Sequence, residues 1–143
     1  MYQSLNLSHA EAQEMVEAVR RRVEADGKAV AIAVSDSHGE LIAFLRMDGC
    51  HLPPVQIAIN KAFTAARERQ PSGTVGESSR VRPFPMTNFG DPRYTGWAGG
   101  VPVIVDGQVV GAVGVSGLDE KSDAEIAAFA ADLATRKARG GRP

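Results

Sequence analysis

Two adjacent side chains, Cys50 and His51, are of the types that bind transition-metal ions. They lie in the stretch RMDGCHLPP (residues 46–54), which holds the only cysteine and one of the three histidines of the chain. A zinc site needs three or four protein ligands, so these two residues are too few for one. Haem needs only one or two axial ligands, and both residue types can serve. The alternative is a solvated turn that binds nothing.

A second group of reactive side chains lies between about Pro71 and Gly100. This stretch reads mostly as a loop, with some helix around residues 75–79, and loops longer than about 15 residues are uncommon unless they are functional. Arginine can hold a carboxylate in a bidentate fork, but arginine and aromatic residues are also enriched at subunit interfaces. The loop holds half of the eight aromatic residues and three arginines: Phe84, Phe89, Tyr94, Trp97, Arg80, Arg82 and Arg93.

The glycines of GAVGVSG, at positions 111, 114 and 117, do not match a nucleotide-binding motif. Their spacing is G-x-x-G-x-x-G and not G-x-G-x-x-G, and the chain has no phosphate-binding Gly-Lys-Ser/Thr sequence. Glycines inside a strand more often mark a close approach of backbones, although Gly114 and Gly117 could also let a ligand lie against bare backbone. Ser116 lacks the spacing of a hydrolase nucleophile, and Cys50 has no obvious general base.

The elements that would position these residues follow from hydrophobic spacing. Ser8 and Glu11 match a capping box, and the apolar residues after them predict a helix of about 18 residues that ends at Asp26-Gly27. The runs AVAIAVSD and LIAFLRMD, separated by SHGE, predict a hairpin. Since both runs are apolar at nearly every position, we expect both faces of both strands to be covered.

A second helix is predicted to begin at Pro53-Pro54 and to pack in the core through one stripe of residues: Val55, Ile59, Ala62, Phe63 and Ala66. Lys61 and Asn60 lie on this helix, where a solvated position is the usual case. Asp106-Gly107 between two β-branched runs predicts a second hairpin with a type I′ turn. Ser122 and Glu125 match a second capping box, which would open a last helix.

The predicted order is helix, hairpin, helix, long loop, hairpin, helix, which indicates an α+β domain with helices covering an antiparallel sheet. The length of 143 residues favours one domain, residues 1–139, followed by a disordered tail at 140–143. A net charge of -1 gives no reason to expect a nucleic-acid partner. One cysteine, no signal-like N-terminus and no apolar run near 20 residues predict a cytoplasmic protein without a membrane span.

The motifs IAINKAFTAA and GGVPVIVDGQVVGAVGVSG, with the helix that contains Asp123, resemble the GlcG/HbpS family, which is related to the C-terminal domain of PduO-type proteins. The resemblance covers nearly the whole chain. It implies a profilin-like layered domain with about five antiparallel strands, and self-association into homo-oligomers. Several members of the family bind haem. Relatives often read MDGAPPLS where this chain has MDGCHLPPV, which adds two candidate ligands.

Two functional hypotheses follow. In the first, the protein binds haem or a related tetrapyrrole, with Cys50 or His51 as axial ligand and arginines paired with the propionates. In the second, it is a cofactor-independent isomerase, lyase or hydrolase of a small carboxylated or aromatic metabolite under the 71–100 loop, with Lys61, Tyr94 or His51 transferring protons. A structural oligomer without ligand is a third possibility. Neither structural zinc nor a nucleotide is expected.

The two groups of residues lead to one prediction about place. We expect Cys50 and His51 at the edge of a ligand pocket. We also expect a loop arginine (Arg80, Arg82 or Arg93) and a loop aromatic (Tyr94 or Trp97) to contact an anionic ligand. That ligand would lie against the Gly114–Gly117 backbone and the Asn60/Lys61 helix.

Overall fold

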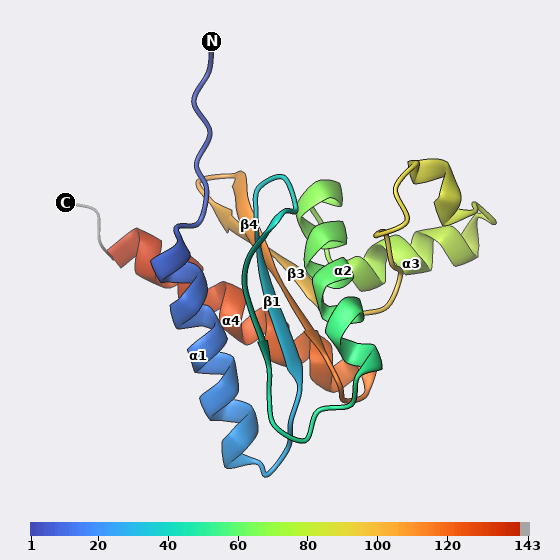
Figure 1. The fold of residues 1–143 in the computed structure, drawn as a ribbon. Helices are drawn as coiled ribbons and strands as arrows, with labels where there is room; N and C mark the ends of the chain where they lie inside the picture. Colours follow the sequence, from blue (N-terminus) through green and yellow to red (C-terminus); the bar gives the residue numbers. More distant parts are fainter. Residues whose placement is uncertain (141–143) are drawn as a thin grey trace.

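A computed structural model describes residues 1–140 and shows an antiparallel sheet with helices on both faces (Figure 1). The α+β architecture is therefore confirmed. The sheet has four strands in residues 1–140, in the order β2-β1-β4-β3, one fewer than the expected five. Their bounds are Ala31–Asp36 (β1), Leu41–Arg46 (β2), Gly100–Val105 (β3) and Gln108–Ser116 (β4).

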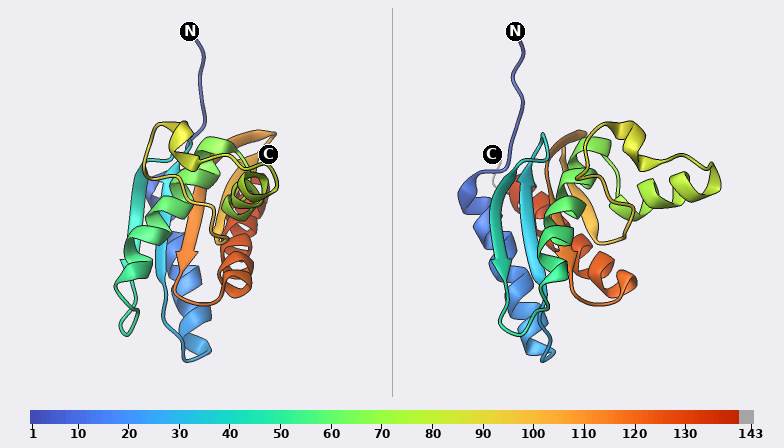
Figure 2. Two further views of the ribbon diagram at one scale, coloured as in Figure 1. Left: turned by 90° about the vertical axis from the view of Figure 1, so that its right-hand side faces the viewer. Right: turned by 45° about the vertical axis from the view of Figure 1, so that its right-hand side comes forward.

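Helices α1 (His9–Ala25) and α4 (Glu120–Gly140) cover one face of the sheet, and α2 (Pro53–Glu68) covers the other. Helix α3 (Ser72–Val81) and the 3-10 helix η1 (Met86–Phe89) follow α2 and stand out from the body of the molecule (Figure 2). Of the predicted tail, Gly140 is the last residue of α4, and residues 141–143 lie outside the described residues. No helix within residues 1–140 is long and apolar enough to cross a membrane.

Two local predictions are confirmed in full. Ser8 and Glu11 form both hydrogen bonds of a capping box at the start of α1, and α1 ends before Asp26 and Gly27. Asp106 and Gly107 connect β3 to β4 with φ of 50° and 76°, as a type I′ turn requires. Helix α2 begins at Pro53, also as expected.

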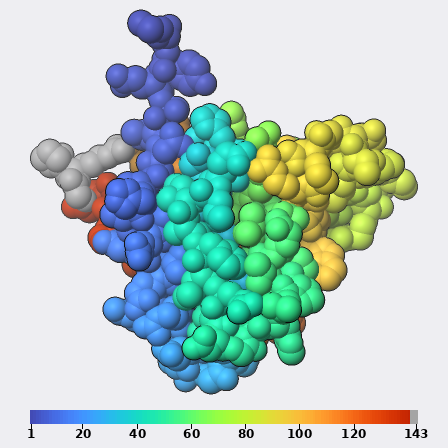
Figure 3. Space-filling view, viewed as in Figure 1, coloured from blue at the N-terminus to red at the C-terminus, as the bar shows by residue number. Residues whose placement is uncertain are grey.

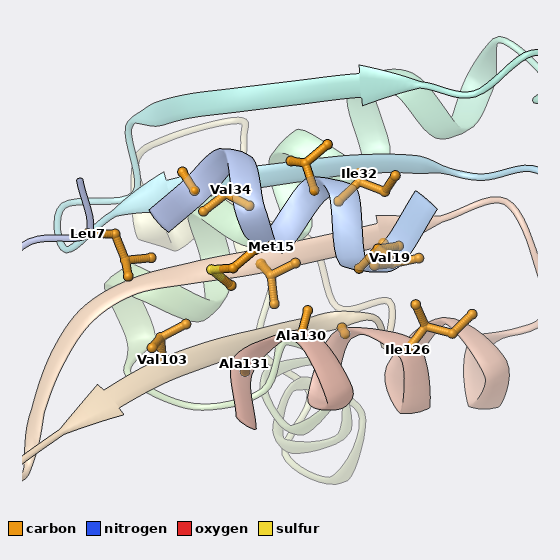
Figure 4. Packing of buried hydrophobic residues seen from close by; sticks show 14 of the residues in the cluster. Leu7, Met15, Val19, Ile32, Val34, Val103, Ile126, Ala130 and Ala131 are labelled. Carbon is orange, nitrogen blue, oxygen red and sulfur yellow. The ribbon is translucent and has the colours of Figure 1, made fainter. Parts of the chain in front are cut away.

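The two faces of the sheet carry side chains of different size. Between the sheet and helices α1 and α4, large aliphatic residues such as Val19, Ile32 and Val103 form the main core (Figure 4). On the α2 face the strands present alanine and glycine. A Cβ at Gly114 would lie 2.1 Å from the Ala58 carbonyl oxygen on α2. The glycines of this strand therefore let a helix approach the backbone.

Helix α3 contains the helical stretch that was predicted around residues 75–79 and extends it to ten residues, Ser72–Val81. These ten residues include Gly73 and Gly76, which lower helix propensity and concealed the full length of the helix in the sequence. The helix is held by close packing, because a Cβ at Gly76 would lie only 2.0 Å from the Gly96 carbonyl oxygen. The buried Ser72 hydroxyl donates to the Trp97 carbonyl at 2.6 Å and accepts from the Gly100 amide at 2.9 Å.

Two other predictions were wrong. Strand β2 is not covered on both faces, since it lies at the edge of the sheet and residues 41–46 are partly or fully exposed. Ser122 does not cap α4. The helix begins two residues earlier, and Asp119 accepts hydrogen bonds from the Ser122 amide at 2.9 Å and from its hydroxyl at 2.7 Å.

Candidate functional site

One face of strand β2 is open beside helix α2. The helix lies mainly over β1, β3 and β4 and contacts the edge strand β2 much less. In the register of the sheet, Phe44 pairs with Ala33 and Arg46 pairs with Ala31. Both alanines pack against α2. Because paired residues project to the same side of a sheet, Phe44 and Arg46 project on the side where α2 lies.

The connection from β2 to α2 brings Cys50 and His51 to this face. Cys50 is partly buried and packs with Phe44 and Ile59 against the alanines under α2, whereas His51 is exposed. We call this set the β2–α2 surface: Phe44, Arg46, Cys50, His51 and Ile59. It combines apolar side chains with one guanidinium and two potential metal ligands. Sequence reasoning missed Phe44 and Arg46, and only the pairing of β2 with β1 could have indicated them.

Burial makes the Cys50 thiol a weaker ligand than its type suggests. Loss of solvation raises the pKa of Cys50; the nearby Arg46 lowers it, and Asp123 raises it further. The thiol also donates a 3.3 Å hydrogen bond to the His51 carbonyl oxygen. Since the thiolate is the form that binds metal, His51 is the more available ligand at neutral pH. Within residues 1–140, no group of three or more His, Cys, Asp and Glu side chains could hold a metal ion.

Lys61 is buried, which corrects the expectation of a solvated lysine. Its side chain is only 1% exposed, and its Nζ donates to Asp123 Oδ2 at 3.1 Å and to the Val115 carbonyl at 2.9 Å. The other carboxylate oxygen of Asp123 accepts from the Leu118 amide at 3.0 Å. The pair therefore links α2, the end of β4 and the start of α4. No sequence signal paired these two residues, which lie far apart in the chain.

Desolvation dominates the electrostatics of this pair. Burial lowers the pKa of Lys61 and raises the pKa of Asp123, and the attraction between the two charges opposes both shifts. With 1% of its side chain exposed, Lys61 does not reach solvent in this structure. The ion pair is thus a structural clamp.

The ligand position predicted against Gly114 is already filled by the protein. Helix α2 packs directly on this strand, so no small molecule fits between Gly114 and the helix. Gly117 adopts φ of 139° beside the Ala29–Val30 backbone. Asn60 is partly exposed and accepts a hydrogen bond from Gln56 on the same helix at 2.9 Å.

Two of the three loop arginines are already paired with carboxylates. Arg80 donates to Glu77 at 2.9 Å. Arg93 binds both oxygens of Asp91 at 3.1 and 3.0 Å and both oxygens of Glu40 at 3.1 Å, and its guanidinium lies 4.0 Å from the centre of the Phe63 ring. Arg93 thereby ties the loop to the β1–β2 turn, which the surface view shows as adjoining gold and cyan regions (Figure 3).

Tyr94 packs among aromatic rings. Its ring stacks on that of Phe89 with 4.4 Å between ring centres, and it meets the edge of the Phe63 ring with 5.1 Å between ring centres. Trp97, by contrast, is 57% exposed. Phe63 and Lys61 are two positions apart on α2 and so project from opposite sides of the helix. His51 lies just before the first turn of α2, whereas Tyr94 contacts Phe63 in the third turn of that helix. The three proposed proton donors, Lys61, Tyr94 and His51, therefore do not meet in one active site.

Comparison with known proteins settles the family. A model of the family described as "Haem degrading protein HbpS-like" matches residues 7–132. The chain belongs to the HbpS-like family. It is also 40% identical over 110 residues to Protein GlcG of Escherichia coli (strain K12), an alignment that covers 77% of this chain and 81% of GlcG. The predicted GlcG/HbpS resemblance is confirmed.

Solved structures share the fold. A crystal structure of a double mutant of HbpS from Streptomyces reticuli is 30% identical with a TM-score of 0.84, covering 93% of this chain and 90% of that chain. The crystal structure of a PduOC:heme complex is 23% identical with a TM-score of 0.79, covering 90% of this chain and 94% of that chain. At this lower identity the likeness concerns the fold alone.

Proposed function

We propose that this protein binds haem or a related tetrapyrrole on the β2–α2 surface, with His51 as the axial ligand. The observation that carries the proposal is the position of His51 and Cys50 at the rim of the open apolar face made by Phe44 and Ile59. The family's description as haem degrading supports the ligand class.

The residues present fit the chemistry of such a ligand. Haem is a flat apolar ring with carboxylates on one edge and an iron that accepts imidazole or thiolate. Phe44 and Ile59 offer apolar contact to the ring, and Arg46 offers a cation to a propionate. Bound haem supplies a redox-active iron whose potential depends on the axial ligand and on the polarity around it.

The preference for His51 over Cys50 as the iron ligand follows from the protonation of the Cys50 thiol. Cys50 is held as a thiol by burial, so it competes poorly for iron near neutral pH. His51 is exposed and directly adjacent. The protein uses His51 to bind iron, while Cys50 contributes apolar packing. The three loop arginines take no part, and Arg46 replaces them as the partner of a propionate.

A titration of haem at pH 7, followed by the Soret absorbance, tests the proposal. Wild type should show a saturable Soret shift that is weakened strongly in His51→Ala and little in Cys50→Ala. His38→Ala is the matched control, because His38 is also exposed but lies in the turn at the opposite end of β2. If wild type shows no saturable shift, or if His51→Ala and His38→Ala titrate alike, the proposal is wrong.

A further inference from the structure

We propose that the protein has a second ligand site, between the end of α2, helix α3 and η1, that binds a single-ring aromatic carboxylate through Arg82. This site is separate from the β2–α2 surface and does not depend on haem binding. It lies in the part of the molecule that projects beyond α2 (Figure 2).

A pocket of about 230 Å³ occupies this position. Its apolar walls come from α3 and from the segment around η1. Its polar lining comes from the end of α2 and the residues just after it, from two serines of α3 and from Arg82. Pockets for drug-sized ligands span roughly 300–1,000 Å³, so this one suits one ring and a short side chain. A tetrapyrrole is too large for it. The residues that matter for binding are Val75, Phe84, Phe89, Arg82, Glu68 and Gln70.

The aromatic wall is anchored to the core. Phe84 meets Phe89 edge-on at 5.9 Å, Phe89 stacks on Tyr94 at 4.4 Å, and Tyr94 meets the buried Phe63 at 5.1 Å. The Ser79 hydroxyl donates to the Phe84 carbonyl at 2.6 Å and fixes the backbone there. Phe84 is 47% exposed, so its ring can offer an edge or a face to a ligand ring.

Arg82 differs from the other loop arginines in having no internal partner. Arg80 is paired with Glu77, and Arg93 is paired with Asp91 and Glu40. The backbone amide of Arg82 donates to the Ser78 carbonyl, but its guanidinium forms no hydrogen bond or ion pair with any residue in 1–140, and the residue lines the pocket. An unpaired guanidinium beside an aromatic wall is the arrangement that recognises an aromatic acid, since the ring and the carboxylate each find a partner.

Two other polar residues of the pocket restrict the class of ligand that it can bind. Glu68 also lines the pocket. A second carboxylate on the ligand would be repelled by Glu68, so a monocarboxylate is favoured over a dicarboxylate. The neutral Gln70 amide can donate to the same carboxylate as Arg82 or to a ring substituent.

The test is a nuclear magnetic resonance titration of the full chain with phenylacetate. We expect saturable shifts in the amides of residues 68–89, much weaker binding of acetate (no ring) and of 2-phenylethanol (no charge), and little effect on the amides of the β2–α2 surface. Arg82→Gln should weaken phenylacetate binding at least tenfold, as the loss of one charge-assisted contact predicts. Arg80→Gln is the matched control and should bind like wild type, because Arg80 lies two residues earlier, in the last turn of α3, and is already paired with Glu77.

Three results would overturn the proposal. The first is an absence of saturable shifts at residues 68–89. The second is equal phenylacetate affinity in Arg82→Gln and Arg80→Gln. The third is a fall in molecular mass on Arg82→Gln with no ligand bound, which would show that a second copy of the chain occupies the pocket. Arg82→Gln should bind haem like wild type, so a failure of the proposed aromatic-acid site can be told apart from a failure of the proposed haem site at His51.

Discussion

Removing the charge of Lys61 should destabilise the protein more than any change of an exposed ion pair. The Nζ of Lys61 contacts Asp123 and the Val115 carbonyl, and both members of the pair are at least 97% buried, with side-chain exposures of 1% and 3%. In Lys61→Met the chain keeps a side chain of similar length. The carboxylate of Asp123 is then left buried without its cation.

The magnitude follows from the cost of an unpaired buried charge. Breaking a buried ion pair by removing one partner costs about 3–5 kcal/mol, against a total stability of about 5–15 kcal/mol for a typical domain. Replacing both charges costs less, because burial already disfavours each ionised form here. We expect Lys61→Met/Asp123→Asn to recover roughly half of the loss, since asparagine retains an oxygen that can accept from the Leu118 amide.

Urea unfolding at pH 7 measures both variants, with Arg80→Met as the control for an exposed pair. Arg80 and Glu77 are 64% and 65% exposed, and breaking such a pair should change the free energy of unfolding very little. A loss below about 1 kcal/mol in Lys61→Met, or a double variant less stable than the single one, would refute the idea that Lys61 clamps the sheet to α2 and α4.

Three further predictions concern packing, reactivity and acid stability. Gly114→Ala should lower the free energy of unfolding, measured by heat or urea, by about 3 kcal/mol or more, because the new Cβ would lie 2.1 Å from the Ala58 carbonyl oxygen. The control Gly140→Ala should not lower it, because nothing lies within 4 Å of the new Cβ there. Alkylation of Cys50 should reach its half-maximal rate at a higher pH in the native protein than in urea, since burial raises its pKa; coincident profiles would contradict this. The hydrogen bonds from Arg93 lower the pKa of Asp91 below its ordinary 3.8. The Asp91 carboxylate should therefore stabilise the fold above that pH, and this stabilisation should be lost as the pH falls through the lowered pKa. If Asp91→Asn leaves the dependence of the unfolding free energy on pH unchanged, this contribution of Asp91 is excluded.

Local signals predicted much of the fold. The capping box at Ser8, the Asp106-Gly107 turn and the prolines that open α2 each act within a few residues, and all three were read correctly. The start of α4 was predicted wrongly. Ser122 was expected to cap the helix, but the Asp119 side chain accepts a hydrogen bond from the Ser122 amide instead.

Features that depend on distant contacts could not be predicted. Helix α3 was predicted only around residues 75–79, because its glycines disfavour a helix in isolation. Its full length is stable because those glycines let the chain at Gly96 and Ala98 pack against it. Lys61 was expected in solvent because its partner, Asp123, lies 62 residues away. The candidate site was predicted in part: Cys50 and His51 were identified, but Phe44 and Arg46 required the register of β2 against β1.

The axial ligand of the haem complex is the most direct test of the central claim. An electron paramagnetic resonance spectrum of the ferric complex at pH 7 distinguishes imidazole from thiolate ligation. We predict the spectrum of imidazole ligation for wild type, Cys50→Ala and His38→Ala, and its loss in His51→Ala. A thiolate-type spectrum for wild type, or an unchanged imidazole spectrum in His51→Ala, would contradict the assignment of His51 as the ligand.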